Sequence, residues 1–244
     1  MRYLVISDIH ANLEALTAVL EVGVQYDKTL VLGDLVGYGA DPNAVVERVR
    51  GLAPAVFIRG NHDKVGAGLE DVDGFNYLAR QAIGWTAAAL TPENREWLAH
   101  LPAGPLIIDD LVEICHGAPF NEDVYVFDDI DALRALRSAR RPLCLFGHTH
   151  VPAAFRLDGE LRPIGPGRRT EFKHTLEDGT QYLVNCGAVG QPRDGDARAA
   201  YGVVDTESRT VEVRRVEYDV AVAQAKIIAA GLPEVLAQRL ALGR

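Results

Sequence analysis

The chain has 244 residues, of which 48% are hydrophobic and 24% are charged, and its formal net charge is −9. This composition is typical of a folded globular protein and excludes fibrous and disordered chains. The acidic balance argues against broad binding to nucleic acid or anionic lipid. No segment has the apolar length that a membrane span or a signal-peptide core requires. We therefore expect a cytoplasmic protein that forms a single domain over residues 1–244.

The first third of the chain alternates strand and helix patterns. Residues 4–6, 30–32 and 55–58 are continuous apolar runs, which are typical of parallel strands that are buried on both faces. Leucines and valines at helical spacing follow the first two runs, over about residues 13–20 and 42–50. This order predicts an α/β fold whose first strands are parallel.

The middle of the chain continues this pattern after an insertion. Two helices are predicted over residues 75–100, before an apolar run at residues 106–108. The runs 112–115 and 143–146 resume the strand pattern, and a helical pattern over about residues 130–136 separates them. Both of these runs lead directly into histidine-containing segments.

Beyond residue 151 the strands are expected to be antiparallel. Strand patterns occupy residues 154–157, 161–164, 182–185, 201–204 and 210–216. The last of these alternates apolar and polar side chains, as strands with one face in water do. We therefore expect a second, half-exposed sheet, followed by two helices over residues 219–244 that are separated at Gly231-Leu232-Pro233.

The three cysteines are Cys115, Cys144 and Cys186. All of them lie in apolar, strand-like contexts, and their number is odd. We therefore expect buried free thiols rather than a disulfide framework.

Five short strings that are rich in metal-binding side chains follow the apolar runs. They are Asp8-Ile-His10, Gly33-Asp34 with Gly39, Gly60-Asn61-His62-Asp63, Cys115-His116-Gly117 and Gly147-His148-Thr149-His150. Functional side chains of open α/β sheets gather at the carboxyl ends of the strands, so we expect these groups to converge. Each string alone has an ordinary structural explanation, such as a helix cap, a turn or a buried histidine. The probability that an unrelated sequence contains all five strings in this order by chance is negligible.

This ordered set resembles the pattern of the calcineurin-like metallophosphoesterase superfamily, which is D-x-H, G-D-x-x-x-x-G, G-N-H-D/E, a later histidine and G-H-x-H. The strings Asn185-Cys186-Gly187 and Gly190-Gln191-Pro192-Arg193-Asp194 further resemble its YfcE-like and diadenosine-tetraphosphatase-like bacterial branches. The resemblance implies an α/β four-layer sandwich, in which two mixed β-sheets are flanked by helices. It also implies a cofactor of two divalent metal ions.

The resemblance further implies a role for each residue of the strings. One ion would be held by Asp8, His10, Asp34 and His150, and the other by Asp34, Asn61, His116 and His148, so that Asp34 bridges the two. A metal-bridging hydroxide would attack the phosphate, and His62 would protonate the leaving group with Asp63 as its orienting partner. Imidazole, carboxylate and amide ligands without thiolate favour manganese, with iron, zinc, cobalt or nickel as alternatives.

Four further polar residues are weaker candidates for substrate binding. Asn12 could contact phosphate or simply cap the following helix. Tyr38 could stack on a substrate ring or pack as an ordinary side chain. Asn185 and Arg193 could line the pocket, although an arginine in a loop rich in glycine and proline is more often a solvated surface group.

These features predict a phosphodiesterase or nucleotide phosphohydrolase that acts on small soluble phosphate esters. A phosphomonoesterase of the protein-serine/threonine phosphatase kind is the first alternative, but such relatives show G-D-x-V-D-R-G where this chain has Gly37-Tyr38-Gly39. A non-catalytic scaffold is the second alternative, and such proteins typically lack ligands that are all present here. The choice between diester and monoester, and the oligomeric state, stay open at this point.

Overall fold

The computed structural model describes residues 1–166 and 171–244. In chain order, these residues form β1 (Arg2–Ile6), α1 (Leu13–Glu21), β2 (Lys28–Val31), α2 (Pro42–Arg50), β3 (Ala55–Phe57), α3 (Asn61–Gly66), the 3₁₀-helix η1 (Val72–Gly74), α4 (Tyr77–Ala89), α5 (Pro92–Ala99), β4 (Leu106–Ile107), β5 (Val112–Ile114), α6 (Asp129–Ser138), β6 (Leu143–Phe146), β7 (Ala153–Leu157), β8 (Leu161–Gly165), β9 (Phe172–Thr175), β10 (Gln181–Asn185), β11 (Ala199–Asp205), β12 (Thr210–Val216), α7 (Val220–Ala229) and α8 (Glu234–Leu242).

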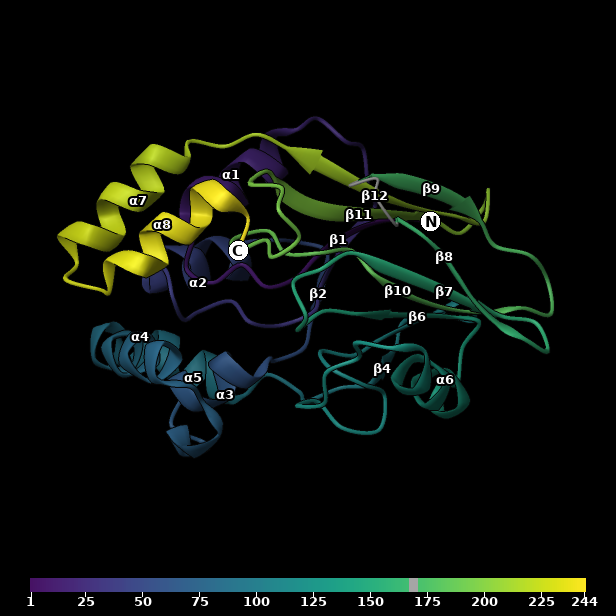
Figure 1. Cartoon of the computed structure of the whole chain (residues 1–244), viewed down its shortest axis with the longest axis horizontal. Coiled ribbons are helices and arrows are strands. Elements are labelled where there is room, and N and C mark those ends of the chain that lie inside the picture. The colour runs from purple at the N-terminus through teal and green to yellow at the C-terminus, as the bar shows by residue number, and fades with distance from the viewer. Residues whose placement is uncertain (167–170) are drawn as a thin grey trace.

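Two mixed sheets lie face to face and form the centre of the molecule (Figure 1). The strand order is β3-β2-β1-β11-β12-β9 in the first sheet and β4-β5-β6-β10-β7-β8 in the second. Helix α1 packs on the outer side of the first sheet at β11, and α6 packs on the second sheet at β10, β7 and β8. The predicted sandwich of two sheets between helices is therefore confirmed.

The continuous apolar runs are explained by burial on both faces of the first sheet. On β1, Leu4 and Ile6 belong to a core shared with α1 and α2, whereas Tyr3 and Val5 belong to the core between the two sheets. All four side chains are almost fully buried. Because successive side chains of a strand point to opposite faces, a strand between two apolar layers needs an apolar residue at every position.

The expectation of a second, half-exposed sheet made of the late strands is only partly confirmed: β7, β8 and β10 lie in the second sheet, but β11 and β12 do not. Strand β11 pairs with β1, with Arg2 opposite Asp205, so β11 and β12 extend the first sheet. Glu212 on β12 is only 9% exposed, because Lys173 on β9 and Arg214 pair with its carboxylate. The alternation of β12 therefore reflects one face in the core between the sheets, at Val211 and Val213, and an opposite face where the partner of Glu212, Lys173, is itself 62% exposed. Strand β9, which supplies Lys173, was not predicted from the sequence.

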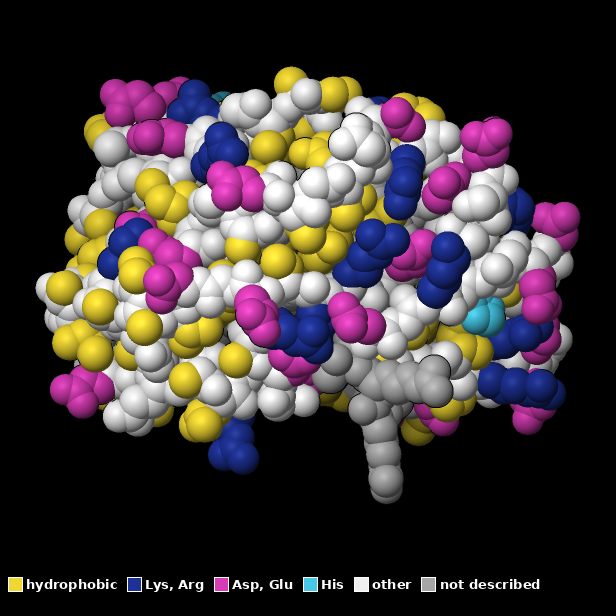
Figure 2. Space-filling model, turned by 90° about the horizontal axis from the view of Figure 1, so that it is seen from above, with side chains coloured by type: hydrophobic (Ala, Val, Ile, Leu, Met, Phe, Trp, Pro, Cys, Tyr) yellow, Lys and Arg dark blue, Asp and Glu magenta, His cyan; other side chains and the backbone are white. Residues whose placement is uncertain are grey.

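Helices α4, α5, α7 and α8 gather at one end of the molecule (Figure 1). The residues that α4, α7 and α8 contribute to a common apolar cluster include Ala79, Ile227, Leu236 and Leu240. Helices α7 and α8 also expose apolar side chains, and Figure 2 shows hydrophobic side chains over this end of the molecule. None of the helices in the described ranges is long and apolar enough to cross a membrane.

The three cysteines are free and buried, as predicted. Cys115, directly after β5, lies beside Cys144 on β6, and their Sγ atoms are 3.7 Å apart. The third, Cys186, follows β10 and lies in the core between the sheets.

Candidate metal centre

The five predicted strings lie in loops that follow the strands at one edge of the two sheets. Asp8 and His10 follow β1, Asp34 follows β2, Asn61 begins α3 after β3, His116 follows β5, and His148 and His150 follow β6. The carboxylates and imidazoles among these residues are at most 3% exposed. The strand topology therefore brings together side chains that are up to 142 positions apart, from Asp8 to His150.

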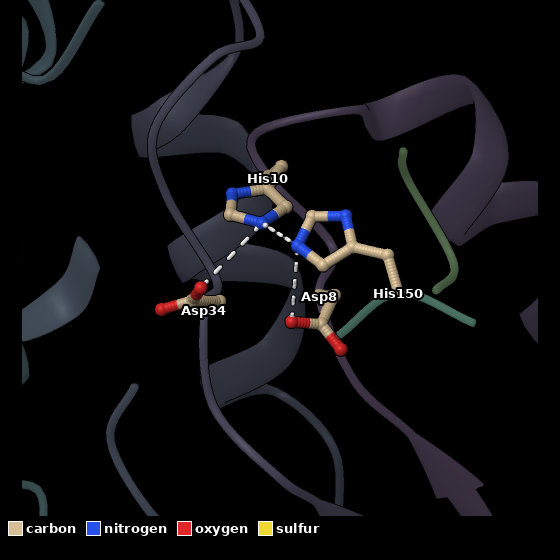
Figure 3. Close-up of side chains that lie close together, drawn as sticks. All are labelled: Asp8, His10, Asp34 and His150. Carbon is tan, nitrogen blue, oxygen red and sulfur yellow. Dashed lines mark hydrogen bonds and ion pairs between the residues drawn. The ribbon is translucent and has the colours of Figure 1, made fainter. Parts of the chain in front are cut away.

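The first group of side chains consists of Asp8, His10, Asp34 and His150 (Figure 3). Each residue offers one ligand atom, and these atoms all lie within 4.8 Å of one another. His10 Nε2 is 3.1 Å from His150 Nε2 and 3.5 Å from Asp34 Oδ2, and His150 Nε2 is 3.4 Å from Asp8 Oδ1. Ligands bonded at about 2.0–2.2 Å to one ion lie roughly 3–4 Å apart, so this spacing suits a single cation.

The second group consists of Asp34, His116 and His148, whose ligand atoms also lie within 4.8 Å of one another. His116 Nε2 is 3.4 Å from Asp34 Oδ2 and 3.3 Å from the Oδ1 atom of Asn61. The Asn61 amide oxygen therefore completes this group. The Asp34 carboxylate belongs to both groups, and the structure places it between them.

Backbone carbonyls fix the orientation of three imidazoles. The Nδ1 atoms of His10, His116 and His150 lie 3.0, 2.7 and 2.7 Å from the carbonyl oxygens of Val36, Leu32 and Gln191. A carbonyl only accepts, so each Nδ1 carries the proton and donates it. In a neutral ring this leaves Nε2 with a free lone pair that points into the centre.

The positions of these Nε2 lone pairs show whether the residues suit a metal ion. Burial lowers the pKa of both His10 and His150 well below the ordinary value, so both rings are neutral. Two neutral rings that present Nε2 lone pairs 3.1 Å apart repel each other unless a cation lies between them and the carboxylates. The donor set of nitrogen and carboxylate oxygen therefore fits a divalent cation.

Charges within the second group are strongly coupled. Burial alone would raise the pKa of Asp34, but the adjacent His116 and His62 hold it well below its usual range. Burial would likewise lower the pKa of His116, but Asp34 raises it to about 10. The two side chains therefore favour each other's charged form across a contact of 3.4 Å. Because a histidine ligand must be deprotonated, cation binding at this group should release a proton.

The loops of the centre are held in an unfavourable backbone conformation. Among the described residues, eight residues other than glycine have a positive φ, and all but Arg209 lie in these loops. They are Asp8, His10, Ala11, Asp34, Tyr38, His148 and His150. The left-handed region is costly for residues with a Cβ, and such conformations concentrate at functional sites. The strings thus hold their side chains in position at a cost in backbone strain.

His62 lies beside the first group. It is 4% exposed, and its ring contacts those of His10 and Tyr38, with centroid distances of 4.8 and 4.6 Å. Its Nδ1 atom has no hydrogen-bond partner among the described residues. A Cβ at Gly37 would collide with this ring, which explains the glycine at that position. Burial lowers the pKa of His62 to about 4.

The expected orienting contact between Asp63 and the His62 ring is absent. Asp63 instead accepts hydrogen bonds from the backbone N–H groups of Leu35 at 2.8 Å, Val36 at 3.2 Å and Gly60 at 2.9 Å. The fully buried Asp63 carboxylate thus fastens the loop after β2, which carries Asp34, to the start of α3. Its role is to position the metal-binding loops.

Two of the four weaker candidates have structural roles instead of lining the centre. Asn12 caps α1 by accepting from Ala15 N at 3.1 Å, and it donates to the Gly190 carbonyl at 2.9 Å. Asn185 donates to the Gly147 carbonyl at 2.7 Å and accepts from Gly187 N at 2.7 Å. The helix-cap alternative is therefore confirmed for Asn12, and both amides are engaged in loop contacts.

The other two weaker candidates, Tyr38 and Arg193, do reach the centre. The Tyr38 ring is 4.8 Å from the His10 ring, and the Arg193 guanidinium lies over its face, 5.7 Å from the ring centroid. The backbone N–H of Arg193 donates to the His150 carbonyl at 3.2 Å. Arg193 is half-buried rather than a fully solvated surface group.

A cavity of about 310 Å³ opens beside the centre. Its lining includes Asn61, His62 and His148 together with Phe75 and Tyr125, which the sequence did not single out. The Tyr125 ring stacks on His148 with a centroid distance of 3.7 Å, and the Asp123 carbonyl accepts from His148 Nε2 at 3.2 Å. This leaves His148 Nδ1 for a cation. Asp123 and Tyr125 belong to no motif, so the sequence analysis did not select them. The presence of an aromatic residue in the loop after His116 was the only feature that pointed to Tyr125.

Comparisons with known proteins agree with this geometry. A family model described as the calcineurin-like phosphoesterase superfamily domain matches residues 1–209. An uncharacterized protein of Methanocaldococcus jannaschii is 39% identical over 252 residues, which cover 98% of this chain and 97% of that protein. A metallophosphoesterase from Sphaerobacter thermophilus has a similar crystal structure, with a TM-score of 0.88 and 41% identity over 100% of this chain and 99% of that one. A hypothetical protein from Pyrococcus horikoshii shares the fold, with a TM-score of 0.81 and 23% identity over 100% of this chain and 98% of that one.

Proposed function

The chain belongs to the calcineurin-like phosphoesterase superfamily, and we propose that it is a phosphodiesterase or nucleotide phosphohydrolase that depends on two divalent metal ions. One observation carries this proposal: the buried Asp34 carboxylate is shared by two groups of ligand atoms. Two cations that are about 3.5–4 Å apart repel each other strongly, and a shared carboxylate offsets that repulsion. A single ion would not require the second group.

The proposed ligands divide into two sets. One ion is held by Asp8, His10, Asp34 and His150, and the other by Asp34, Asn61, His116 and His148. When bound, the two metal ions would activate a water nucleophile at neutral pH and neutralise charge on the phosphate oxygens. Manganese suits this donor set, and iron, zinc, cobalt or nickel are alternatives.

We assign the protonation of the leaving oxygen to His62. The ring lies next to His10 and lines the cavity beside the centre, where a substrate would bind. Burial lowers the pKa of His62 to about 4, so the ring is neutral near pH 7 in the free protein. The negative charge of a bound phosphate favours the protonated ring. His62 would therefore gain a proton as the substrate binds and donate it to the leaving alkoxide.

The proposed substrates are small phosphate esters or nucleotides, and we expect hydrolysis in the cytoplasm. The cavity beside the centre has a volume of about 310 Å³ and combines polar groups with the rings of Phe75 and Tyr125. This lining suits a compact organic group attached to phosphate. Because the cavity is only about 310 Å³ in volume, a small ester fits it better than a folded protein substrate does.

The test combines metal analysis with two chromogenic esters. Purified protein that has been loaded with manganese should contain two ions per chain and should hydrolyse bis-p-nitrophenyl phosphate faster than p-nitrophenyl phosphate. Removal of metal with EDTA should abolish both activities, and manganese should restore them. Faster hydrolysis of the monoester would favour a phosphomonoesterase, and protein without bound metal or activity would favour a scaffold.

A further inference from the structure

The four imidazoles of the two ligand groups do not have equal support. The carbonyls that orient His10, His116 and His150 belong to buried residues. The carbonyl that accepts from His148 Nε2, at 3.2 Å, belongs to Asp123, which is exposed. Because the acceptor of a ring N–H fixes how that ring is presented to a cation, the second group depends on a segment at the surface.

Ion pairs hold this segment, the loop between β5 and α6, against α3. On α3, Lys64 Nζ lies 2.9 and 2.8 Å from the two carboxylate oxygens of Asp123 and 3.4 Å from Oε1 of Glu122. Arg59, which precedes α3, donates to the two oxygens of Glu122 at 3.1 and 2.9 Å. The same helix begins at Asn61, whose amide oxygen belongs to the second group. The ion pairs therefore join two segments that both serve this group.

Lys64 is buried, with only 7% of the residue exposed. Lysine is almost never buried to this degree unless it is paired. Its Nζ also lies 2.5 Å from Glu70, so three carboxylates surround one ammonium group. Burial opposes the charge of Lys64, but hydrogen bonds to Asp123 and Glu70 outweigh this effect and raise its pKa. An ammonium group has three N–H donors, so these carboxylates leave none for a substrate.

Loss of the Lys64 charge would change the forces on the loop. The carboxylates of Glu70, Glu122 and Asp123 would remain near one another, and among the described residues only Arg59 would still pair with one of them. Carboxylates that repel each other favour positions in water, where their charges are screened. Asp123 would then move away from α3, and its carbonyl would lose the contact with the ring that it orients.

We propose that Lys64 is a positioning residue that sets the affinity of the second metal ion, through Asp123 and His148. The proposal rests on the proposed function, because it requires that two ions bind. It also goes beyond that function, since it predicts that the two ions respond differently to one substitution. Lys64 directly follows the string Gly60-Asn61-His62-Asp63 but is not part of it.

The experiment measures manganese binding rather than hydrolysis. Calorimetric titration of the metal-free protein gives a dissociation constant for each ion, and electron paramagnetic resonance distinguishes a coupled pair of ions from single ions. His148→Gln, which removes a ligand of the second group, identifies the constant that belongs to the second ion. Lys64→Gln should raise this constant by about 10–100-fold and reduce the signal of the coupled pair, but change the constant of the first ion by no more than about threefold. Lys64→Arg should retain part of the affinity.

Two further variants separate this role from a general loss of stability. Asp123→Asn breaks the same ion pair from its exposed end but keeps the backbone carbonyl, so it should weaken the second ion even if Lys64→Gln does not fold. Lys226→Gln is the matched control, because Lys226 Nζ also joins two carboxylates, those of Glu14 at 2.5 Å and Asp41 at 2.7 Å. It should leave the dissociation constant of the second ion unchanged.

The outcomes also separate the two proposals. A wild type that binds fewer than two manganese ions would overturn the proposed function. A wild type that binds two ions, while Lys64→Gln and Asp123→Asn keep its constant for the second ion, would overturn only the role of Lys64. Equal weakening of both ions in Lys64→Gln, or the same weakening in Lys226→Gln, would likewise show that this lysine supports the fold without positioning a ligand.

Discussion

The metal centre and the cavity beside it are built in different ways. In the centre, each imidazole is fixed by a backbone carbonyl, the side chains are buried, and the loops adopt positive φ angles. In the cavity, Tyr125 is 40% exposed and the polar groups come from several loops. We therefore expect the fixed centre, called the rigid part below, to determine the chemistry of the site, and the more exposed cavity, called the adaptable part, to determine the choice of substrate.

The largest effect is expected from substitution of Asp34, the ligand that both groups share. Asp34→Asn removes a negative charge from both ligand groups, so bound manganese should fall from two ions per chain to fewer than one. Hydrolysis of bis-p-nitrophenyl phosphate should fall by roughly a thousandfold, as expected when stabilisation of transition-state charge is lost. Metal analysis and kcat measure this. The exposed Asp110→Asn should change neither, and retention of two ions in Asp34→Asn would contradict a shared ligand.

Substitution of His62 tests whether the centre contains a proton donor in addition to the metal ligands. His62→Gln should slow esters with basic alkoxide leaving groups by about 10²–10⁴-fold, because these leaving groups need a proton. Nitrophenyl esters should be slowed much less, and metal content should remain unchanged. The exposed His100→Gln is the control. Equal slowing of both classes of ester would remove the general-acid role.

A smaller effect is expected when all metal ligands are kept but Asp63, which holds their loops in place, is changed. Asp63→Asn places an amide opposite three backbone donors, so one N–H must lose its acceptor. A buried unsatisfied group costs about 1–3 kcal/mol, which for a chain of this size corresponds to a Tm lower by roughly 2–10 °C. Catalysis should fall about 10–100-fold, as is typical for residues that orient metal ligands. Thermal unfolding and kcat both check this, and an unchanged Tm would show that the carboxylate is dispensable.

The smallest effect is expected from a substitution in the cavity beside the metal centre, which is the adaptable part. Tyr125→Ala removes a ring from the cavity but no metal ligand, so KM for aromatic esters should rise about tenfold, which is the size of one stacking contact. The value of kcat should change no more than about threefold, because His148 keeps its contact with the Asp123 carbonyl. Tyr26→Ala, far from the cavity in sequence, should have no effect on either constant. A large fall in kcat would mean that Tyr125 supports the metal centre itself.

The sequence predicted the rigid part better than the adaptable one for a physical reason. Metal ligation needs particular side-chain types at fixed positions after buried strands, so residues such as Asp34 and His116 leave a recognisable pattern. Phe75 and Tyr125 line the cavity from positions that only the folded chain brings close. A single sequence contains no short-range signal for such contacts.

Errors in the fold have a similar origin. The alternation in β12 correctly predicted a strand, but not that this strand would pair with β11 in the first sheet or that Lys173 and Arg214 would pair with Glu212. Strand pairing depends on contacts over long distances in the chain, as between β1 and β11. Likewise, Asp63 was expected to orient its sequence neighbour His62, whereas its hydrogen bonds lead to Leu35 and Val36 on another loop.

The carbonyl contacts of His10, His116 and His150 have one more consequence. These bonds are made by the polypeptide itself, so the main chain of three separate loops sets the direction of each Nε2 atom. A substitution that displaces one of these carbonyls should therefore misalign a ligand nitrogen even though no ligand residue is changed.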